Sequence, residues 1–127
     1  MSLLIEGAKT ELGEYVIRPE ELKFAFQPIW NTKTNSIYGY ECLMRPYGKA
    51  PMDYINAYSE AGRLNEIEEL TLLYGTQAFL DARLPGFLFM NSFPSTCVSL
   101  EINQRLKCAF QQKMKNRLVV EVLEYTR

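Results

Sequence analysis

Two opposite charges lie within an otherwise apolar and aromatic segment, residues 37–46, with the sequence IYGYECLMRP. Glu41 and Arg45 are four residues apart. An extended strand sends alternate side chains to the same face, so both charges share one surface at a separation of roughly 13 Å. That separation suits a binding site whose ligand contacts both residues better than it suits an ion pair. The alternative is an edge strand with a polar face exposed to water, and this segment alone does not decide between the two.

Composition limits the chemistry that these 127 residues can perform. The chain has no histidine, which excludes histidine triads, histidine general bases and histidine-ligated zinc and leaves carboxylates, amides, lysine and arginine. The cysteines Cys42, Cys97 and Cys108 lack a metal-binding spacing and predict free thiols in a reducing cytoplasm. The net charge of -1 argues against binding to a polynucleotide or an anionic membrane, and no apolar run approaches the roughly 18 residues of a membrane span.

The first third of the chain predicts a lead-in followed by a hairpin. Residues 1–20 are weakly patterned and are expected to form a flexible lead-in, so the predicted domain covers residues 21–127. An aromatic segment at 24–30 and the strand at 37–46 are separated by six turn-forming residues. This arrangement indicates an antiparallel hairpin, in which Pro28 belongs on an edge strand.

Helical spacing predicts three helices after the hairpin. The first covers residues 52–62, the second begins near a capping-box-like pair, Asn65 and Glu68, and ends before Pro85, and the third follows Pro94. Each helix has an apolar stripe that is expected to face the core. The stripes are Met52, Ile55 and Tyr58 in the first helix, Ile67, Leu70, Tyr74 and Ala78 in the second, and Ile102, Leu106, Ala109 and Phe110 in the third.

Two short apolar runs, at residues 87–91 and 118–124, predict strands that are buried on both faces. Strands of this kind that alternate with helices form right-handed β-α-β units around a parallel sheet covered by helices. The expected class is therefore α/β, with an antiparallel first strand followed by parallel β-α units.

Polar residues follow the apolar parts of these strands. In β-α folds, polar groups at the carboxyl ends of successive strands meet at one rim, where ligands bind. The rule gathers Glu41 and Arg45, Asn91, and Glu121 with Glu124 at one rim. Carboxylates and an amide oxygen without imidazole or thiolate favour magnesium or manganese. The metal would attract a phosphate-bearing substrate, and the arginine offers a bidentate partner for its oxygens.

Four motifs, in register over residues 27–124, resemble the EAL-domain family. They are Gln-Pro-Ile at 27–29, Gly-Tyr-Glu-Cys-Leu-Met-Arg at 39–45, Met-Asn-Ser at 90–92 and Val-Val-Glu-Val-Leu-Glu at 119–124. The Glu-Ala-Leu that names the family appears here as Glu41-Cys42-Leu43. The resemblance implies a modified (β/α)8 barrel of the TIM type with an antiparallel first strand. It also implies hydrolysis of cyclic di-GMP to linear pGpG in bacterial second-messenger signalling, with two Mg²⁺ or Mn²⁺ ions in the intact domain.

The resemblance assigns roles to six positions of this chain. They are the metal ligands Glu41, Asn91 and Glu121, the substrate phosphate contact Arg45, the nucleotide contact Gln27, and Glu124, which matches the acid that steadies the loop presenting further ligands. The implied mechanism is metal-assisted, because two cations lower the pKa of a bridging water that attacks one phosphorus in line.

The sequence departs from the family in composition and in extent. Cys42 replaces the motif's alanine and Met44 the following leucine, both on the face away from the charges, where they alter only packing. The paired aspartates, the lysine and the later glutamate of the family lie beyond the strand of Glu121 and have no counterpart here. The chain is therefore expected to be the N-terminal half of an EAL domain, with no complete catalytic set and no hydrolysis of its own. Its exposed barrel edge predicts self-association, or a proteolytic remnant of a longer domain.

Two other functions stay open at this point. The chain can belong to a non-catalytic receptor that binds cyclic di-GMP or a protein partner, although its intact matching positions favour catalysis. It can also be an unrelated β-α domain whose acids are solvated rim residues. The last alternative predicts no stabilisation by divalent metal.

Overall fold

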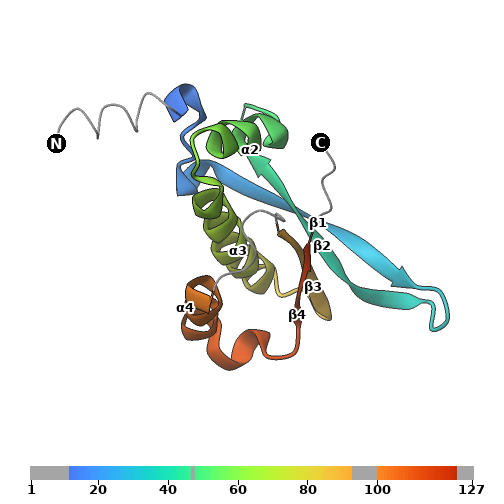
Figure 1. The fold of residues 1–127 in the computed structure, drawn as a ribbon. Helices are drawn as coiled ribbons and strands as arrows, with labels where there is room; N and C mark the ends of the chain where they lie inside the picture. Colours follow the sequence, from blue (N-terminus) through green and yellow to red (C-terminus); the bar gives the residue numbers. More distant parts are fainter. Residues whose placement is uncertain (1–11, 47, 93–99, 123–127) are drawn as a thin grey trace.

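A computed structural model describes residues 12–46, 48–92 and 100–122 of the chain (Figure 1). These residues form a mixed α/β fold in which helices pack on a four-stranded mixed sheet. The order of hairpin, two helices, strand, helix and strand is confirmed. The strands are β1 (Leu22–Asn31), β2 (Ser36–Pro46), β3 (Phe87–Ser92) and β4 (Leu118–Val122); the α-helices are α2 (Pro51–Glu60), α3 (Leu64–Asp81) and α4 (Leu100–Phe110); and the short 3-10 helices are Gly13–Tyr15, Pro19–Glu21 and Gln111–Met114.

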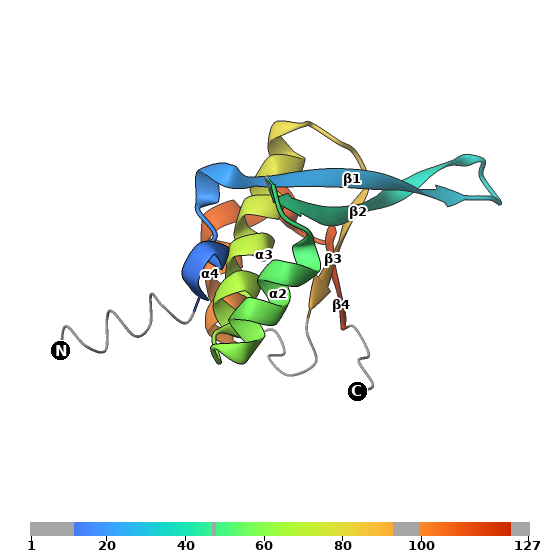
Figure 2. The same ribbon diagram turned by 90° about the horizontal axis from the view of Figure 1, so that it is seen from above.

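The predicted antiparallel hairpin is confirmed, and it extends well past the helices (Figure 2). Its turn is held by the Asn31 side chain, whose Oδ1 accepts hydrogen bonds from the backbone N–H groups of Lys33 at 3.0 Å and Thr34 at 3.4 Å. β1 is the first strand in the sheet order and so an edge strand. This placement suits Pro28, because proline has no backbone N–H to donate and is tolerated where a strand has no neighbour on one side.

The sheet has the order β1-β2-β3-β4, and its last three strands are parallel. β2 and β3 are paired only from Gly39 opposite Phe87 to Glu41 opposite Phe89. β3 and β4 stay paired as far as Ser92. Beyond Phe89, therefore, β3 is paired with β4 but not with β2.

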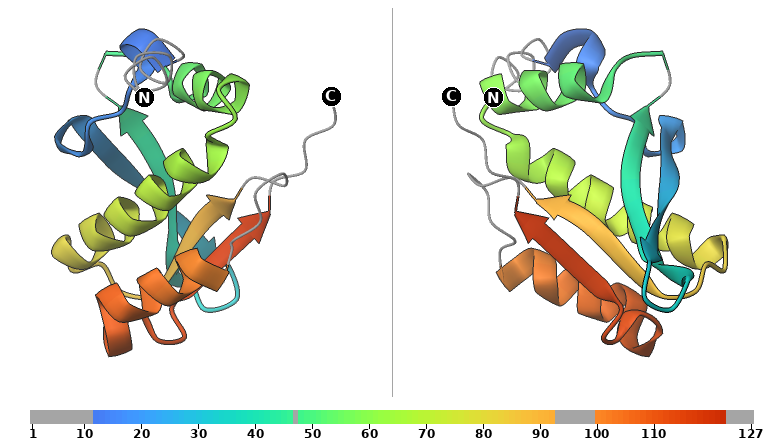
Figure 3. Two further views of the ribbon diagram at one scale, coloured as in Figure 1. Left: turned by 60° about the vertical axis from the view of Figure 1, so that its left-hand side comes forward. Right: turned by 90° about the vertical axis from the view of Figure 1, so that its right-hand side faces the viewer.

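The helices α3 and α4 lie on the same face of the sheet (Figure 3). β3 alternates half-buried and buried residues, with Leu88, Met90 and Ser92 buried. This corrects the expectation of strands buried on both faces, because within the described residues no helix covers the face that carries Phe87 and Phe89. The apolar run arises because aromatic rings also occupy that second face: the centroid of the Tyr38 ring lies 4.9 Å from that of Phe87 and 6.0 Å from that of Phe89.

The core-facing side of α3 agrees only in part with the stripe predicted for it, of which Ile67 is fully buried. Leu72 and Phe79 are fully buried, whereas Tyr74 is 43% exposed. The helix is apolar around much of its circumference, so spacing alone does not define its inner face. The predicted capping box is also wrong, because the N-cap is Arg63, without a side-chain cap, and Glu68 is fully buried.

The other two helices follow their predicted stripes in part. In α2 the buried side chains are Tyr54 and Tyr58, and Met52 is exposed. In α4 the apolar positions of the stripe are buried as expected, except that Ala109 is exposed. The main core therefore combines one face of the sheet with α3 and α4. Its buried members are Cys42, Leu72, Phe79, Leu88, Met90, Ile102, Leu106, Phe110 and Met114.

A second, smaller core contains residues from the predicted lead-in. Leu12 and Ile17 are buried together with Tyr54, Tyr58 and Ile67. The backbone N–H of Ile17 donates a hydrogen bond of 3.0 Å to the Tyr58 hydroxyl oxygen. Two apolar side chains and one hydrogen bond to a side-chain hydroxyl thus attach part of residues 12–20 to the helices, a packing that the weak sequence pattern of residues 1–20 did not predict. Residues 1–11 lie outside the described part of the chain.

Gly39 lets β2 approach β3 closely. A Cβ atom at this position would lie 2.5 Å from the Phe87 carbonyl oxygen and 3.0 Å from the Phe87 Cβ, so the backbone of one strand would have to shift. We expect Gly39→Ala to lower the free energy of unfolding by about 1–3 kcal/mol, the usual cost of overpacking. Urea unfolding followed by circular dichroism measures this. Thr32→Ala in the exposed turn is the control, with an expected change below about 0.5 kcal/mol; equal values for both variants would contradict the close approach.

Candidate functional site

The three predicted metal ligands belong to the sheet face opposite α3 and α4. Asn91 on β3 is directly paired with Glu121 on β4, and Glu41 on β2 is paired with Phe89, two residues before Asn91. Paired residues point to the same face, and so do residues two apart along a strand. The register therefore gives Glu41, Asn91 and Glu121 a common face. Asn91 lies about 7 Å farther along β3 than the partner of Glu41.

The two predicted substrate contacts lie on the hairpin. Gln27 on β1 is the antiparallel partner of Glu41, which gives both side chains the same face. Arg45 also shares this face, is exposed, and donates from Nη1 to the Met44 carbonyl oxygen at 2.9 Å. Glu124, the sixth predicted position, lies outside the described residues.

Lys23 is a candidate that the sequence analysis missed. It is paired with Arg45 across the hairpin and is exposed, so two cationic side chains are neighbours on this face. Adjacent cations of this kind suit a phosphate group, because each can donate to its oxygens. The signal that could have found Lys23 is the hairpin register: pairing Gln27 with Glu41 also pairs the residue four before Gln27 with the residue four after Glu41.

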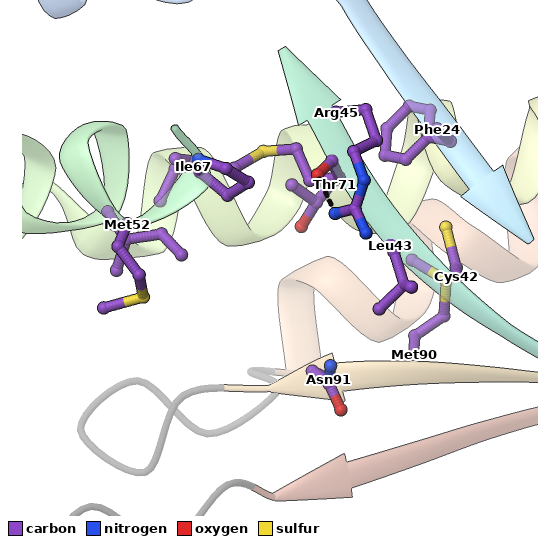
Figure 4. A pocket seen from close by; sticks show the side chains of 12 residues that line it. Phe24, Cys42, Leu43, Arg45, Met52, Ile67, Thr71, Met90 and Asn91 are labelled. Atoms are coloured by element: carbon purple, nitrogen blue, oxygen red, sulfur yellow. Dashed lines mark hydrogen bonds between the residues drawn. The ribbon is translucent and has the colours of Figure 1, made fainter. Parts of the chain in front are cut away.

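A cavity of about 210 Å³ opens where β2 and β3 separate (Figure 4). Arg45 and Asn91 lie on its two strands, and Leu43 extends from β2 between them. The cavity continues toward α2 and α3. Its remaining lining residues are Phe24, Cys42, Met44, Pro51, Met52, Ile55, Ile67, Thr71 and Met90. An apolar cavity with a guanidinium and an amide at its strands suits a ligand that has a polar part and a small apolar or ring-shaped part.

The thiol of Cys42 is buried on the helix-facing side of β2. Burial, and to a smaller extent the negative charge of the neighbouring Glu41, raises its pKa from the ordinary value of 9.0 to about 12. Cys42 and Cys108 are free thiols, whereas Cys97 lies outside the described residues.

This raised pKa makes stability depend on pH in the alkaline range. In the unfolded chain the Cys42 thiol ionises near pH 9, but in the folded chain it stays protonated until about pH 12. The unfolded state therefore binds fewer protons above pH 9, and the free energy of unfolding falls as pH rises. Between pH 7 and pH 10.5 we expect wild type to lose about 2 kcal/mol relative to Cys42→Ala. Chemical denaturation at both pH values measures this, and a constant difference would refute it.

The described residues do not bring three acidic, cysteine or histidine side chains close enough together to hold a metal ion. The candidate ligands on the common face are instead two carboxylates, Glu41 and Glu121, and the amide oxygen of Asn91. Such a set consists of hard oxygen donors, which fit Mg²⁺ or Mn²⁺ when water completes the coordination.

Comparison with models of protein families, with curated proteins and with solved structures finds no match to this chain. Within the described residues, no helix is long and apolar enough to cross a membrane. The candidate site therefore consists of oxygen donors on one sheet face, two cations farther along the hairpin on the same face, and a cavity where the strands separate.

Proposed function

We propose that this chain is the N-terminal part of an EAL-type domain that binds cyclic di-GMP through a divalent metal. The proposal rests above all on the pairing of Asn91 with Glu121, on the face shared with Glu41. Three hard oxygen donors from successive strands are the ligand set that the EAL motifs imply. The proposal includes a cytoplasmic location, which the free thiols of Cys42 and Cys108 favour.

The architecture supports a partial (β/α)8 barrel as the parent fold. An antiparallel first strand precedes parallel strands, and α3 and α4 lie on one face of the sheet. In a barrel of this type helices cover the outside and the other face lines the interior. We assign the face of Glu41, Asn91 and Glu121 to that interior, where ligands bind at the carboxyl ends of the strands.

The residues of this face have distinct chemical tasks in the proposal. Glu41, Asn91 and Glu121 would hold Mg²⁺ or Mn²⁺. The metal would supply Lewis-acid activation of water and of the phosphate ester. Arg45 and Lys23 would neutralise phosphate charge, and the Gln27 amide would hydrogen-bond the nucleotide. Further ligands of the family have no counterpart in these 127 residues, so we propose that they bind the metal without hydrolysing the nucleotide.

Titration of the 127-residue chain with Mn²⁺, and then with cyclic di-GMP in Ca²⁺, tests the proposal. We expect Mn²⁺ to raise the melting temperature, and the nucleotide to bind only when a divalent cation is present. No pGpG should form. If neither metal nor nucleotide stabilises the fold, the acids are solvated side chains of an unrelated β-α domain.

A non-catalytic receptor or interaction module is the second candidate. It is favoured by the exposed apolar side chains on the hairpin, where Trp30 is 59% exposed, Ile37 40% and Tyr38 45%. Apolar side chains gathered in this way are typical of surfaces that contact a partner. The two candidates differ in turnover: in Mg²⁺ the full-length gene product releases pGpG if it is an enzyme, and returns cyclic di-GMP unchanged if it is a receptor.

Self-association through β4 is also part of the proposal. β4 is the last strand of the described sheet, so its outer edge can accept a strand from a second copy. We expect light scattering of the 127-residue chain to show a dimer or larger species at high concentration. A monomer under those conditions would contradict this.

A further inference from the structure

A buried polar pair joins α3 to the end of β3. Glu68 and Ser92 are both fully buried, and the Ser92 hydroxyl donates a hydrogen bond to Glu68 Oε1. Placing a carboxyl group inside a protein is unfavourable, and it is tolerated where hydrogen bonds satisfy its oxygens. An apolar residue would fill this position of α3 without that cost. A glutamate here therefore suggests a task beyond filling the core.

The location of the pair indicates what that task is. Ser92 is the last residue of β3 and directly follows Asn91, so the two side chains point to opposite faces of the strand. β2 pairs with β3 only as far as Phe89, so among the described strands residues 90–92 are paired with β4 alone. The hydrogen bond to Glu68 holds this segment from the helix side, next to the cavity that opens between β2 and β3.

We propose that Glu68, acting through Ser92, is a positioning residue for Asn91. Fixing the Ser92 side chain on the helix side fixes the rotation of the strand about its axis. The direction of the Asn91 side chain on the opposite face is then also fixed. That this orientation holds the Asn91 amide oxygen toward a metal ion rests on the proposed function. The coupling between the Ser92 hydrogen bond and the direction of the Asn91 side chain does not depend on that function. Residues that support a ligand in this way contribute to metal affinity without touching the metal.

The coupling is tested without metal by the NMR signals of the Asn91 side-chain amide. We expect Ser92→Ala, which removes the donor, to shift both amide proton signals and to speed their exchange with solvent. Ser92→Cys keeps the size but is a weak donor, so it should move the same signals less. If Ser92→Ala does not fold, Ser92→Cys decides the question. Unchanged Asn91 signals in the folded variant would overturn the proposal.

Two control variants separate positioning from a general loss of stability. Thr76→Val removes a second fully buried hydroxyl, which lies on α3 and whose oxygen has no hydrogen-bond partner within the described residues. Phe79→Leu lowers stability near the other end of α3. Neither should move the Asn91 amide signals. If either control moves them as far as Ser92→Ala does, the effect is a general loosening of the core and the proposal is wrong.

Titration with Mn²⁺ alone then tests whether the positioning of Asn91 contributes to metal binding. We expect Ser92→Ala to bind Mn²⁺ about tenfold more weakly than wild type, and Thr76→Val to bind it as wild type does. If Ser92→Ala moves the Asn91 signals but wild type binds no Mn²⁺, the positioning role stands and the proposed function fails. If wild type binds Mn²⁺ and Ser92→Ala binds it equally well, the positioning of Asn91 for metal is refuted while the proposed function stands.

Discussion

Replacing Glu41 by glutamine should weaken the binding of Mn²⁺ by about 100-fold or more, equivalent to roughly 2.7 kcal/mol of binding free energy. The glutamine side chain has the same shape but offers a neutral oxygen, and hard divalent cations bind carboxylates much more strongly than amides. The position is well suited to this test because Glu41 is a half-buried residue in a paired part of β2, between Gln27 on one side and Phe89 on the other. Titration calorimetry with Mn²⁺ measures the effect.

The control for this experiment is Glu60→Gln. Glu60 is the exposed last residue of α2, and its replacement changes the net charge of the chain by the same amount. A site that binds metal through specific ligands should distinguish the two variants, since distant surface charges are screened by salt. Equal weakening by Glu41→Gln and Glu60→Gln would mean that the cation binds only through the general charge of the protein.

Replacing Phe79 by alanine should lower the free energy of unfolding by about 3–5 kcal/mol. Phe79 is fully buried in α3, and its ring contacts those of Phe26 and Tyr40 edge to face, at centroid distances of 5.8 and 6.2 Å. The Arg117 guanidinium lies 5.1 Å from the centre of the same ring. Truncation therefore leaves a cavity and also removes aromatic and cation-π contacts.

Chemical denaturation measures this loss, and Tyr74→Ala is its matched control. Tyr74 is an aromatic residue of the same helix but is 43% exposed, so its loss should cost no more than about 1 kcal/mol. If Tyr74→Ala proves as harmful as Phe79→Ala, the inner face of α3 is assigned wrongly. The stripe predicted from spacing would then be the better description.

Local patterns were sufficient to predict the elements and their order. Turn-forming residues between two aromatic segments predicted the hairpin, and Pro28 predicted its place on an edge strand. The start of β3 at Phe87 and most of the apolar stripe of α4 were also expected, since period and flanking residues carry this information along the chain. For the candidate site, alternation along β2 was enough to give Glu41 and Arg45 one face.

Contacts between distant residues were not available from those patterns. The inner face of α3 depends on which of its many apolar residues meet the sheet, and the core uses Leu72 and Phe79 instead of Tyr74. Glu68 has the spacing of a cap, yet its carboxyl accepts a hydrogen bond from a serine 24 positions away. Lys23 became a candidate only through its cross-strand pairing with Arg45.

The amino-acid order therefore accounts for the element types, the hairpin and the oxygen donors of the candidate site, because these depend on neighbours within a few positions. The register between strands, the burial of Glu68 and Ser92 and the opening between β2 and β3 come from packing in three dimensions. Register in particular is set by how whole strands and helices fit together, so the sequence predicted a shared rim for Asn91 and Glu121 but not their direct pairing.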